Sequence, residues 1–299
     1  IMQHGPQRQL LGHVHVQPAV MRFGSIDVPI ARLRHFAMFP EFRIQGHADV
    51  LLTAAEKYAK NSGAMLCVAR GGEQDLLGRH SWVHAGYDPV SIVTPQRLLG
   101  QLPAPATPES PFYGAQMPEY YVRIGRLTDL HDMKQLYENH LSSQHGTVIR
   151  DDEYWSWLVS RGAHHRIFMF FEADVPRAYI VVRHASVLEL VDSTEDGRGA
   201  ARLLEQVGAD AIEQGRYSLR IHAPIDDPVH RWADKADGRL YIGDAAEAWQ
   251  VKVTSFRALL RRLAPEMFRS QRRQNVVERL GVRIGSETFC IARGVRSMK

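Results

Sequence analysis

Cysteine is scarce in this chain of 299 residues, and long hydrophobic runs are absent. Cys67 and Cys290 stand far apart in no metal-binding motif, which argues against a disulfide framework or a zinc site and fits a reducing cytoplasm. No window holds about 18 consecutive apolar residues, so no transmembrane helix is expected. No signal peptide is visible. The chain also lacks the Gly-Lys-Ser/Thr and GxGxxG motifs, which excludes a P-loop and a dinucleotide-binding fingerprint.

The net charge of +4 is unevenly distributed along the chain. Residues 256–299 hold ten Arg, one Lys and three Glu, a net charge of +8, so the first 255 residues sum to −4. Such a basic segment either binds phosphate groups of nucleic acid or membrane, or is a solvated helix face docked on an acidic neighbour. No aromatic residues interleave its arginines in a nucleic-acid-binding motif, so nucleic acid is not an expected partner.

The first hundred residues predict alternating strands and helices. Strands are expected at 10–23, 27–39 and 64–70, a helix at 46–61, and a helix followed by a turn at 72–87. The helix at 46–61 carries apolar residues at helical spacing, namely Val50, Leu51, Ala54, Ala55 and Tyr58. A linker with five prolines is expected at 102–118.

A second α/β pattern follows the linker. Strands are expected at 120–127, 166–172, 177–193 and 217–224, and helices at 130–141, 151–162, 197–215 and 226–238. Both halves therefore repeat the order strand pair, helix, strand, helix, which indicates an internal duplication. An amphipathic helical stretch broken at Pro265 is expected at 247–268, and a hairpin at 280–292. Because the chain opens with Ile1 and closes soon after a strand-like run, we expect a fragment of a longer protein or residues missing at both ends.

The segment Phe39–Ala48 joins a predicted strand to a predicted helix. Pro40 ends the strand, since it cannot donate to the ladder. The first N–H groups of a helix lack internal partners and lie at the positive end of its dipole, which suits a phosphate. Gly46 would let a ligand approach the backbone, and Arg43 could add a charge-assisted hydrogen bond. The same residues also suit an ordinary strand-to-helix turn with a surface arginine, so the loop alone leaves both interpretations open.

The motif R-x-x-G-x-A at Arg43–Ala48 resembles the R/Q-x-x-G-x-G/A signature of the GCN5-related N-acetyltransferases. Its flanks are similar as well: a "PEFR" turn, a helix beginning Val50-Leu51-Leu52, and an Ala85-Gly86-Tyr87 that resembles the family's closing "GF". This resemblance covers roughly residues 10–95, although the family's opening strand and two helices have no counterpart before Leu10. The wider layout is similar to proteins of the enhanced intracellular survival type, which place two tandem acetyltransferase-like domains before a sterol-carrier-like domain.

The resemblance implies an α/β (α+β) fold of two tandem mixed-sheet domains plus a partial C-terminal α+β module. A first, acetyl-CoA-binding domain is expected at 1–101, the linker at 102–118, a second, degenerate domain at 119–245, and the start of a sterol-carrier-like module at 246–299. The implied function is an N-acetyltransferase that moves an acetyl group from acetyl-CoA to a small-molecule or peptide amine by direct attack. The alternative is a catalytically weak or inactive acyl-CoA-binding or assembly protein. A cytoplasmic homo-oligomer is also implied, a hexamer being the family's form.

Cofactor-binding residues follow from the resemblance position by position. The pantetheine arm of acetyl-CoA would lie along Phe36, Ala37 and Met38. The pyrophosphate would lie on the following loop, formed by Arg43, Ile44, Gln45, Gly46, His47 and Ala48. In the second region, Asp192–Ala200 stands at the matching strand-to-helix place, and its acidic residues would repel phosphate, so we expect that copy not to bind the cofactor.

The catalytic residues are less determined by the resemblance. Many family members place a Tyr four residues before the closing glycine to donate to the thiolate, but here that residue is Trp82, whose indole N–H is no useful acid. His84 and Tyr87 are the nearby candidates to replace it, together with His80. His35, on the motif strand, is either a base that accepts a proton near neutral pH or a buried structural histidine. No metal site is expected, because the paired histidines at 13 and 15 and at 164 and 165 have no carboxylate or cysteine at ligand spacing.

Overall fold

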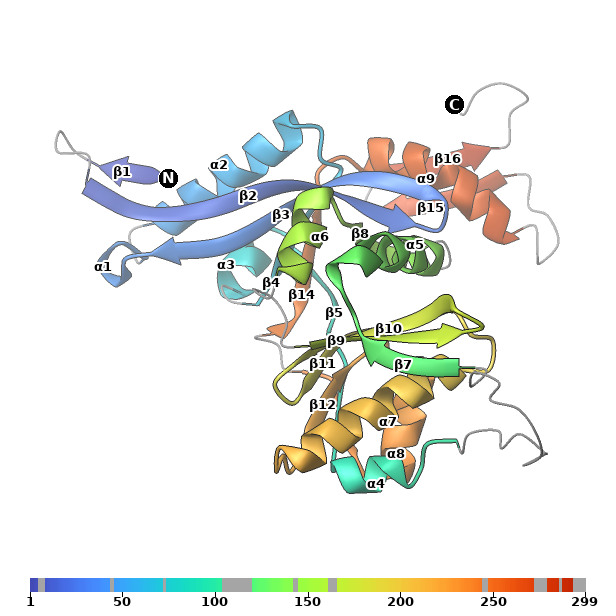
Figure 1. The fold of residues 1–299 in the computed structure, drawn as a ribbon. Helices are drawn as coiled ribbons and strands as arrows, with labels where there is room; N and C mark the ends of the chain where they lie inside the picture. The colour runs from blue at the N-terminus through green and yellow to red at the C-terminus, as the bar shows by residue number, and fades with distance from the viewer. Residues whose placement is uncertain are drawn as a thin grey trace, which may run out of the picture. The chain divides into compact units, whose positions relative to one another are not determined.

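The computed structural model describes residues 1–4, 9–43, 46–71, 74–103, 120–141, 145–160, 166–243, 247–271, 279–284 and 287–292 (Figure 1). The chain divides into two compact units: unit 1 is Ile1–Gly86, Leu141–Ile149 and Asp244–Lys299, and unit 2 is Tyr87–His140 and Arg150–Gly243. These units do not coincide with the ranges 1–101, 119–245 and 246–299, since residues 87–101 pack with unit 2. The predicted linker falls almost entirely outside the described residues.

Unit 1 is built on a mixed sheet. Its described strands are Met2–His4 (β1), Gln9–Phe23 (β2), Ile26–Met38 (β3), Leu66–Arg70 (β4), Val83–Gly86 (β5), His145–Ile149 (β8) and Trp249–Val253 (β14). They follow the order β1-β2-β3-β4-β14-β5, with β8 on β2. β2 and β3 form a long antiparallel hairpin, β3 and β4 run parallel, and β14 is antiparallel to both β4 and β5. The sheet is therefore completed by a strand that lies far along the chain.

The described helices of unit 1 are Pro40–Arg43 (α1), His47–Asn61 (α2), Gln74–Arg79 (α3) and Phe256–Gln271 (α9). Helix α2 covers the sheet with a buried face made by Ala48, Leu51, Leu52, Ala55 and Ala59. The predicted face was partly wrong, because Val50 and Tyr58 are exposed. Two leucines and three alanines therefore form the buried face of this helix.

Unit 2 repeats this architecture. Its described strands are Val90–Val93 (β6), Tyr120–Ile124 (β7), Arg166–Glu172 (β9), Val175–Arg183 (β10), Ser186–Asp192 (β11), Leu219–His222 (β12) and Arg239–Tyr241 (β13). Their order is β13-β6-β12-β11-β10-β9-β7. The described helices are Pro95–Leu99 (α4), the 3-10 turn Leu127–Asp129 (η1), Leu130–Leu141 (α5), Asp152–Val159 (α6), Arg198–Glu213 (α7) and Pro228–Lys235 (α8).

The two units share one path through their sheets, as Figure 1 lets the reader follow. In unit 1 the chain runs β2-β3-α2-β4-α3-β5, and in unit 2 it runs β10-β11-α7-β12-α8-β13. In both, a strand from another part of the chain lies between the last two strands of this path: β14 in unit 1 and β6 in unit 2. The predicted α/β fold class and the predicted repetition of its elements are thus present.

Two sequence predictions were wrong in detail. The single strand expected at 177–193 is a hairpin, because His184 adopts a left-handed conformation with φ 53° and turns the chain between β10 and β11. The helix expected from 247 begins only at Phe256, since alternating Trp249, Val251 and Val253 form β14 against the core. Pro265 lies inside α9 and does not end it. The predicted C-terminal hairpin is present as Arg279–Ile284 (β15) and Glu287–Ala292 (β16).

Candidate functional site

Strand β3 separates from β4 before it ends. The two strands pair only from Ile30 to Leu33 on β3, opposite residues 66–69, although β3 continues to Met38 alongside β2. Along this last stretch Phe36 is half-buried, Ala37 is exposed and Met38 is buried. A strand edge without its neighbour presents backbone N–H and C=O groups at the sheet's interior, where an extended ligand can pair with them.

A bulge marks the point of separation. The β2–β3 register shifts between His13 and His15, and His35 has a φ of 53°. A left-handed conformation is uncommon for a residue with a Cβ and is typical of sites where a bulge re-aims side chains. The His35 side chain is exposed, and its ring stacks on that of His15 with centroids 6.4 Å apart. His35 is therefore not the buried structural histidine considered from the sequence.

Beyond β3, the chain turns through α1 and enters α2 at Gly46. The glycine has φ 75° and ψ 1°, a conformation that favours glycine at the start of this helix. A Cβ built on Gly46 would meet no atom of the described residues within 4 Å, so among these residues the space over this backbone is open. The predicted cofactor residues Ile44 and Gln45 lie outside the described residues. His47 is half-buried and Ala48 is buried at the first turn of α2.

Charged groups surround this helix start. The Nε of Arg43 donates to the carbonyl of Met38 at 3.3 Å, so the arginine ties the loop to the end of β3. Asp49, in the first turn, lies 3.0 Å from Nε2 of His80 and 3.5 Å from the guanidinium of Arg79. The hydrogen bond with His80 is the main cause that lowers the pKa of Asp49. The carboxylate therefore already has an imidazole and a guanidinium as neighbours at the positive end of the helix.

Trp82, which stands where many family members have Tyr, is a structural residue here. Its side chain is buried, and its Nε1–H donates to Oε1 of Glu56 at 2.7 Å. The other carboxylate oxygen of Glu56 accepts from Nζ of Lys252 on β14 at 2.6 Å. The indole N–H is thus engaged in a link between α2 and the inserted strand.

The three residues predicted to be catalytic do not lie side by side in the sheet. His35 is on β3 and the exposed His84 is on β5, and both β4 and β14 lie between them. Three strand spacings amount to about 14 Å, which exceeds hydrogen-bond reach. Tyr87 is the first residue of unit 2. Cys67 on β4 is buried, and burial raises the pKa of its thiol to about 11, so it is unsuited to act as a nucleophile.

Unit 2 contains the same geometry. β11 pairs with β12 only at Ser186 and Val187 and then continues to Asp192. Gly197 begins α7 with φ 74° and ψ 12°, nearly the values of Gly46. The strand, the left-handed glycine and the helix thus recur in unit 2 as the same structural motif.

In unit 2, however, the chain itself occupies the helix start. The carboxylate of Asp192 accepts from the backbone N–H groups of Thr194 at 2.8 Å and Ala200 at 2.7 Å. The hydroxyl of Thr194 accepts from the N–H of Gly199 at 3.2 Å. Burial is the main cause that raises the pKa of Asp192, against the effect of these hydrogen bonds. A phosphate would have to displace this internal carboxylate.

The largely buried guanidinium of Arg150 in unit 2 could not be predicted from the sequence. The Arg150 guanidinium lies over the rings of Tyr137, Tyr154 and Trp155 at 4.0, 4.9 and 5.0 Å and forms a bidentate ion pair with Glu189 on β11. Burial opposes its charge, yet the carboxylate of Glu189 raises the pKa of Arg150 above its usual range. These partners come from three separate elements, α5, α6 and β11, so only the folded chain reveals them.

Within the described residues, no three His, Cys, Asp or Glu side chains gather closely enough to hold a metal ion. None of the described helices is both long and apolar enough to span a membrane. The histidines at 164 and 165 lie outside the described residues.

Comparison with solved structures identifies this fold. A GCN5-related N-acetyltransferase from Anabaena variabilis matches with a TM-score of 0.68 at 13% identity over 98% of this chain and 72% of its own. One from Kribbella flavida matches with a TM-score of 0.60 at 14% identity over 82% and 57%. Eis1 from Mycobacterium abscessus matches with a TM-score of 0.59 at 17% identity over 87% and 65%. The chain matches no protein-family model and no curated protein sequence.

These similarities show that the chain has the fold of the GCN5-related N-acetyltransferases, so the predicted resemblance is confirmed at the level of the fold. The chain spans only 57% to 72% of the length of these solved structures. The sterol-carrier-like module at 246–299 stays a prediction, as do the domain ranges and the site residues.

Proposed function

We propose that this chain is an N-acyltransferase whose unit 1 binds acetyl-CoA and transfers its acetyl group to an amine. The observation that carries the proposal is the contrast between two copies of one motif. In unit 1, open space lies over the left-handed glycine that starts α2. In unit 2, the carboxylate of Asp192 accepts from the N–H of Ala200 in the first turn of α7 and so occupies that helix start, and the Trp232 ring lies 3.7 Å from a Cβ built on Gly197. Helix starts of this kind are natural seats for phosphate.

The residues of unit 1 suit such a donor. Backbone groups of Phe36, Ala37 and Met38 lie beyond the last β3–β4 pair and can bond an extended pantetheine arm. The pyrophosphate is assigned to the loop Arg43–Ala48, where the first amides of α2 and a guanidinium supply positive potential. Acetyl-CoA would supply the acetyl group as a thioester.

The acceptor amine forms a bond to the acetyl carbon, the carbon–sulfur bond breaks, and one amine proton must be removed. We propose that the exposed imidazole of His35 accepts this proton. His35 lies at the bulge, next to the separated end of β3. The leaving thiolate is proposed to take its proton from water, because the predicted donors are His84, about 14 Å across the sheet from His35, and Tyr87, which belongs to unit 2. The amine acceptor is proposed to be a small molecule or peptide, and the protein a cytoplasmic homo-oligomer.

The direct test is thiol release from acetyl-CoA with a panel of polyamine, aminoglycoside and peptide amines, together with calorimetric titration of coenzyme A. Amine-dependent thiol release supports the enzyme. Coenzyme A binding without turnover would favour the non-catalytic acyl-CoA-binding protein over the enzyme. The absence of coenzyme A binding would contradict both hypotheses.

Gly46→Asn tests the seat itself. Asparagine tolerates the left-handed conformation, but its side chain would occupy the open space over the helix start. We expect coenzyme A affinity to fall by about tenfold or more, which corresponds to about 1.4 kcal/mol. Gly63→Asn is the matched control, since Gly63 follows the other end of α2 with φ 83° and equally open surroundings. An equal loss in both variants would point to strain and not to the seat.

A further inference from the structure

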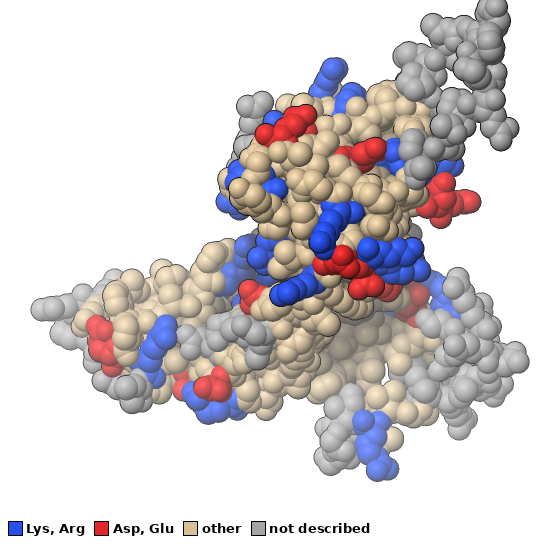
Figure 2. All heavy atoms as spheres, turned by 90° about the horizontal axis from the view of Figure 1, so that it is seen from below, with Lys and Arg blue, Asp and Glu red and all other residues tan. Residues whose placement is uncertain are grey.

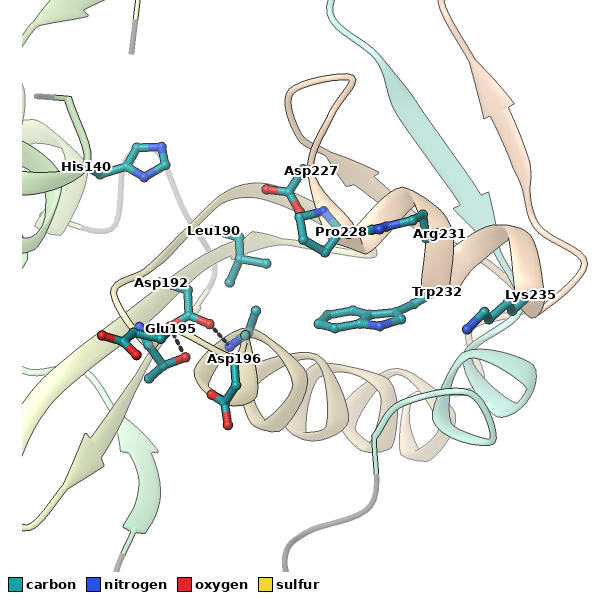
Figure 3. Close-up of a pocket in the computed structure, with 13 residues that line it drawn as sticks. His140, Leu190, Asp192, Glu195, Asp196, Asp227, Pro228, Arg231, Trp232 and Lys235 are labelled. Carbon is teal, nitrogen blue, oxygen red and sulfur yellow. Dashed lines mark hydrogen bonds between the residues drawn. The ribbon is translucent and has the colours of Figure 1, made fainter. Parts of the chain in front are cut away.

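A pocket of about 490 Å³ lies in unit 2, between the loop that follows β11 and the helix α8 (Figure 3). Its volume falls within the range of small-ligand sites, about 300–1,000 Å³. Leu190 and Trp232 form apolar walls, and most of the other side chains are charged. Since no described group of carboxylates converges at metal-ligand spacing, the pocket suits an organic ligand better than a metal ion.

Several of its acidic groups are already used within the protein. Asp192 caps the start of α7, Asp196 accepts from the backbone N–H of Arg198 at 3.1 Å, and Asp227 caps α8 through the N–H of Val229 at 2.9 Å. The helix start therefore offers no seat to a phosphate. The carboxylates of Asp192 and Asp196 make the end of the pocket at the loop after β11 negative.

Three charged side chains of the pocket stay available. Among the described residues, no hydrogen bond or ion pair engages Glu195, Arg231 or Lys235, and all three are exposed. Figure 3 shows Glu195 at the loop end and the two cations along α8 toward the other end. Arg231 and Lys235 are four residues apart, so they share one face of the helix. The pocket thus has carboxylates at the loop end, whereas the α8 end has two cations together with Asp227, whose carboxylate is used in capping the helix.

Trp232 bridges the two ends. Its side chain is half-buried, and its ring reaches the glycine that starts α7, since a Cβ built on Gly197 would lie 3.7 Å from it. In Figure 3 the indole lies between the carboxylates and Lys235. An indole face binds planar rings by stacking and also attracts organic cations.

We propose that this pocket binds an elongated zwitterion: a small molecule with an amine at one end, an anionic group at the other and a planar middle. The amine faces Glu195, the anionic group faces Arg231 and Lys235, and the planar part lies on Trp232. The site belongs to unit 2 alone and requires no acetyl-CoA. Its failure would leave the proposed acyl transfer in unit 1 untouched.

The probe is 4-(aminomethyl)benzoate, which carries an amine and a carboxylate on opposite sides of a ring. Its two matched controls are benzylamine, which lacks the carboxylate, and 4-methylbenzoate, which lacks the amine. Binding to the full chain is measured by calorimetry and by NMR without acetyl-CoA. We expect a dissociation constant on the order of 1 mM for a ligand of this size, and at least about fivefold weaker binding of each control.

Surface variants then assign the ends. Glu195→Gln should weaken the binding of 4-(aminomethyl)benzoate and benzylamine but leave that of 4-methylbenzoate unchanged. Lys235→Gln should weaken the binding of 4-(aminomethyl)benzoate and 4-methylbenzoate but leave that of benzylamine unchanged. Glu213→Gln, exposed at the far end of α7, is the matched control and should change nothing. The proposal is overturned if no probe binds at about 10 mM, if all three bind alike, or if neither end variant alters binding.

Discussion

Asp129 is a carboxylate whose surroundings fix its charge. It is 5% exposed, and it accepts two hydrogen bonds from the guanidinium of Arg123, at 2.7 and 2.8 Å, and one from the N–H of Arg126 at 2.6 Å. The hydrogen bonds with Arg123 are the main cause that lowers the pKa of Asp129 below its ordinary value of 3.8. The ion pair joins β7 to the turn that begins α5.

Asp129→Asn should lower the free energy of unfolding by about 3 kcal/mol at pH 7, because the half-buried guanidinium of Arg123 loses its charged partner. Since the folded-state pKa is lowered, this stabilisation is complete above the unfolded-state pKa near 3.8 and is lost as the pH falls through the folded-state pKa. Urea unfolding of both proteins at pH 7 and about pH 3 should show the difference shrinking. Glu138→Gln, exposed on α5, serves as the control and should show neither effect.

Arg150 yields a second prediction. Arg150→Ala would leave the half-buried carboxylate of Glu189 without its cation, with the hydroxyl of Tyr179 still donating to it, so we expect a loss of about 3 kcal/mol in unfolding free energy. The double variant Arg150→Met, Glu189→Gln removes both charges and should regain most of that loss. A control at the exposed Arg183, Arg183→Ala, should stay within about 0.5 kcal/mol of the parent. A double variant as unstable as the single one would show that the aromatic contacts, not the charge, carry the stability.

For single residues, the sequence could predict the loop around Gly46 but not the contacts of the side chains near it. Gly46 and its flanks stood out because glycine and helix spacing are local signals. Trp82 stood out too, but its partners Glu56 and Lys252 lie 26 and 170 residues away, so its structural role could not be read locally. The bulge that exposes His35 depends on the β2–β3 register, which no local pattern fixes.

Among the elements, β14 has the most consequence. It pairs with β4 on one side and β5 on the other, so these two strands meet only through it. The sequence predicted a helix here, because the apolar run leads directly into α9. The alternation of Trp249, Val251 and Val253 is too short to outweigh a helix pattern on local grounds.

Truncation tests this role with a built-in reporter. A chain that ends at Gln271 keeps β14, whereas one that ends at Gly243 lacks it, and in both Cys67 is the sole thiol. Cys67 is buried on β4 opposite Lys252. We expect a disulfide reagent to label Cys67 at least about 100-fold faster in the shorter chain, because local opening no longer limits access. Val251→Pro in the longer chain separates the loss of the strand from the loss of α9, and equal protection in all of them would contradict the prediction.

For the whole molecule, the duplicated layout was predictable and the division of the chain was not. Order and type of elements follow from periodicity, which is why the two halves could be recognised as copies. The units are not continuous, however, because β8 and β14 join the sheet of unit 1 although segments of unit 2 precede each of them along the chain. A boundary sought in a proline-rich stretch cannot reveal such an exchange.

One face of the molecule carries surface charge of mixed sign (Figure 2). On the face shown in Figure 2, charged side chains of both signs are interspersed and do not form one extended patch. Part of the basic C-terminal segment, including Arg272 and Arg273, lies outside the described residues.

The late position of β14 also bears on how the chain is made. β4 leaves the ribosome about 180 residues before β14, the strand that pairs with its edge. At about 5–20 residues per second, this leaves the edge of a buried strand unpaired for roughly 10–40 s during synthesis. Such an edge is a template for wrong pairing between nascent chains. Production of this protein should therefore depend on translation speed and on chaperones that hold nascent chains, even when the finished molecule is stable.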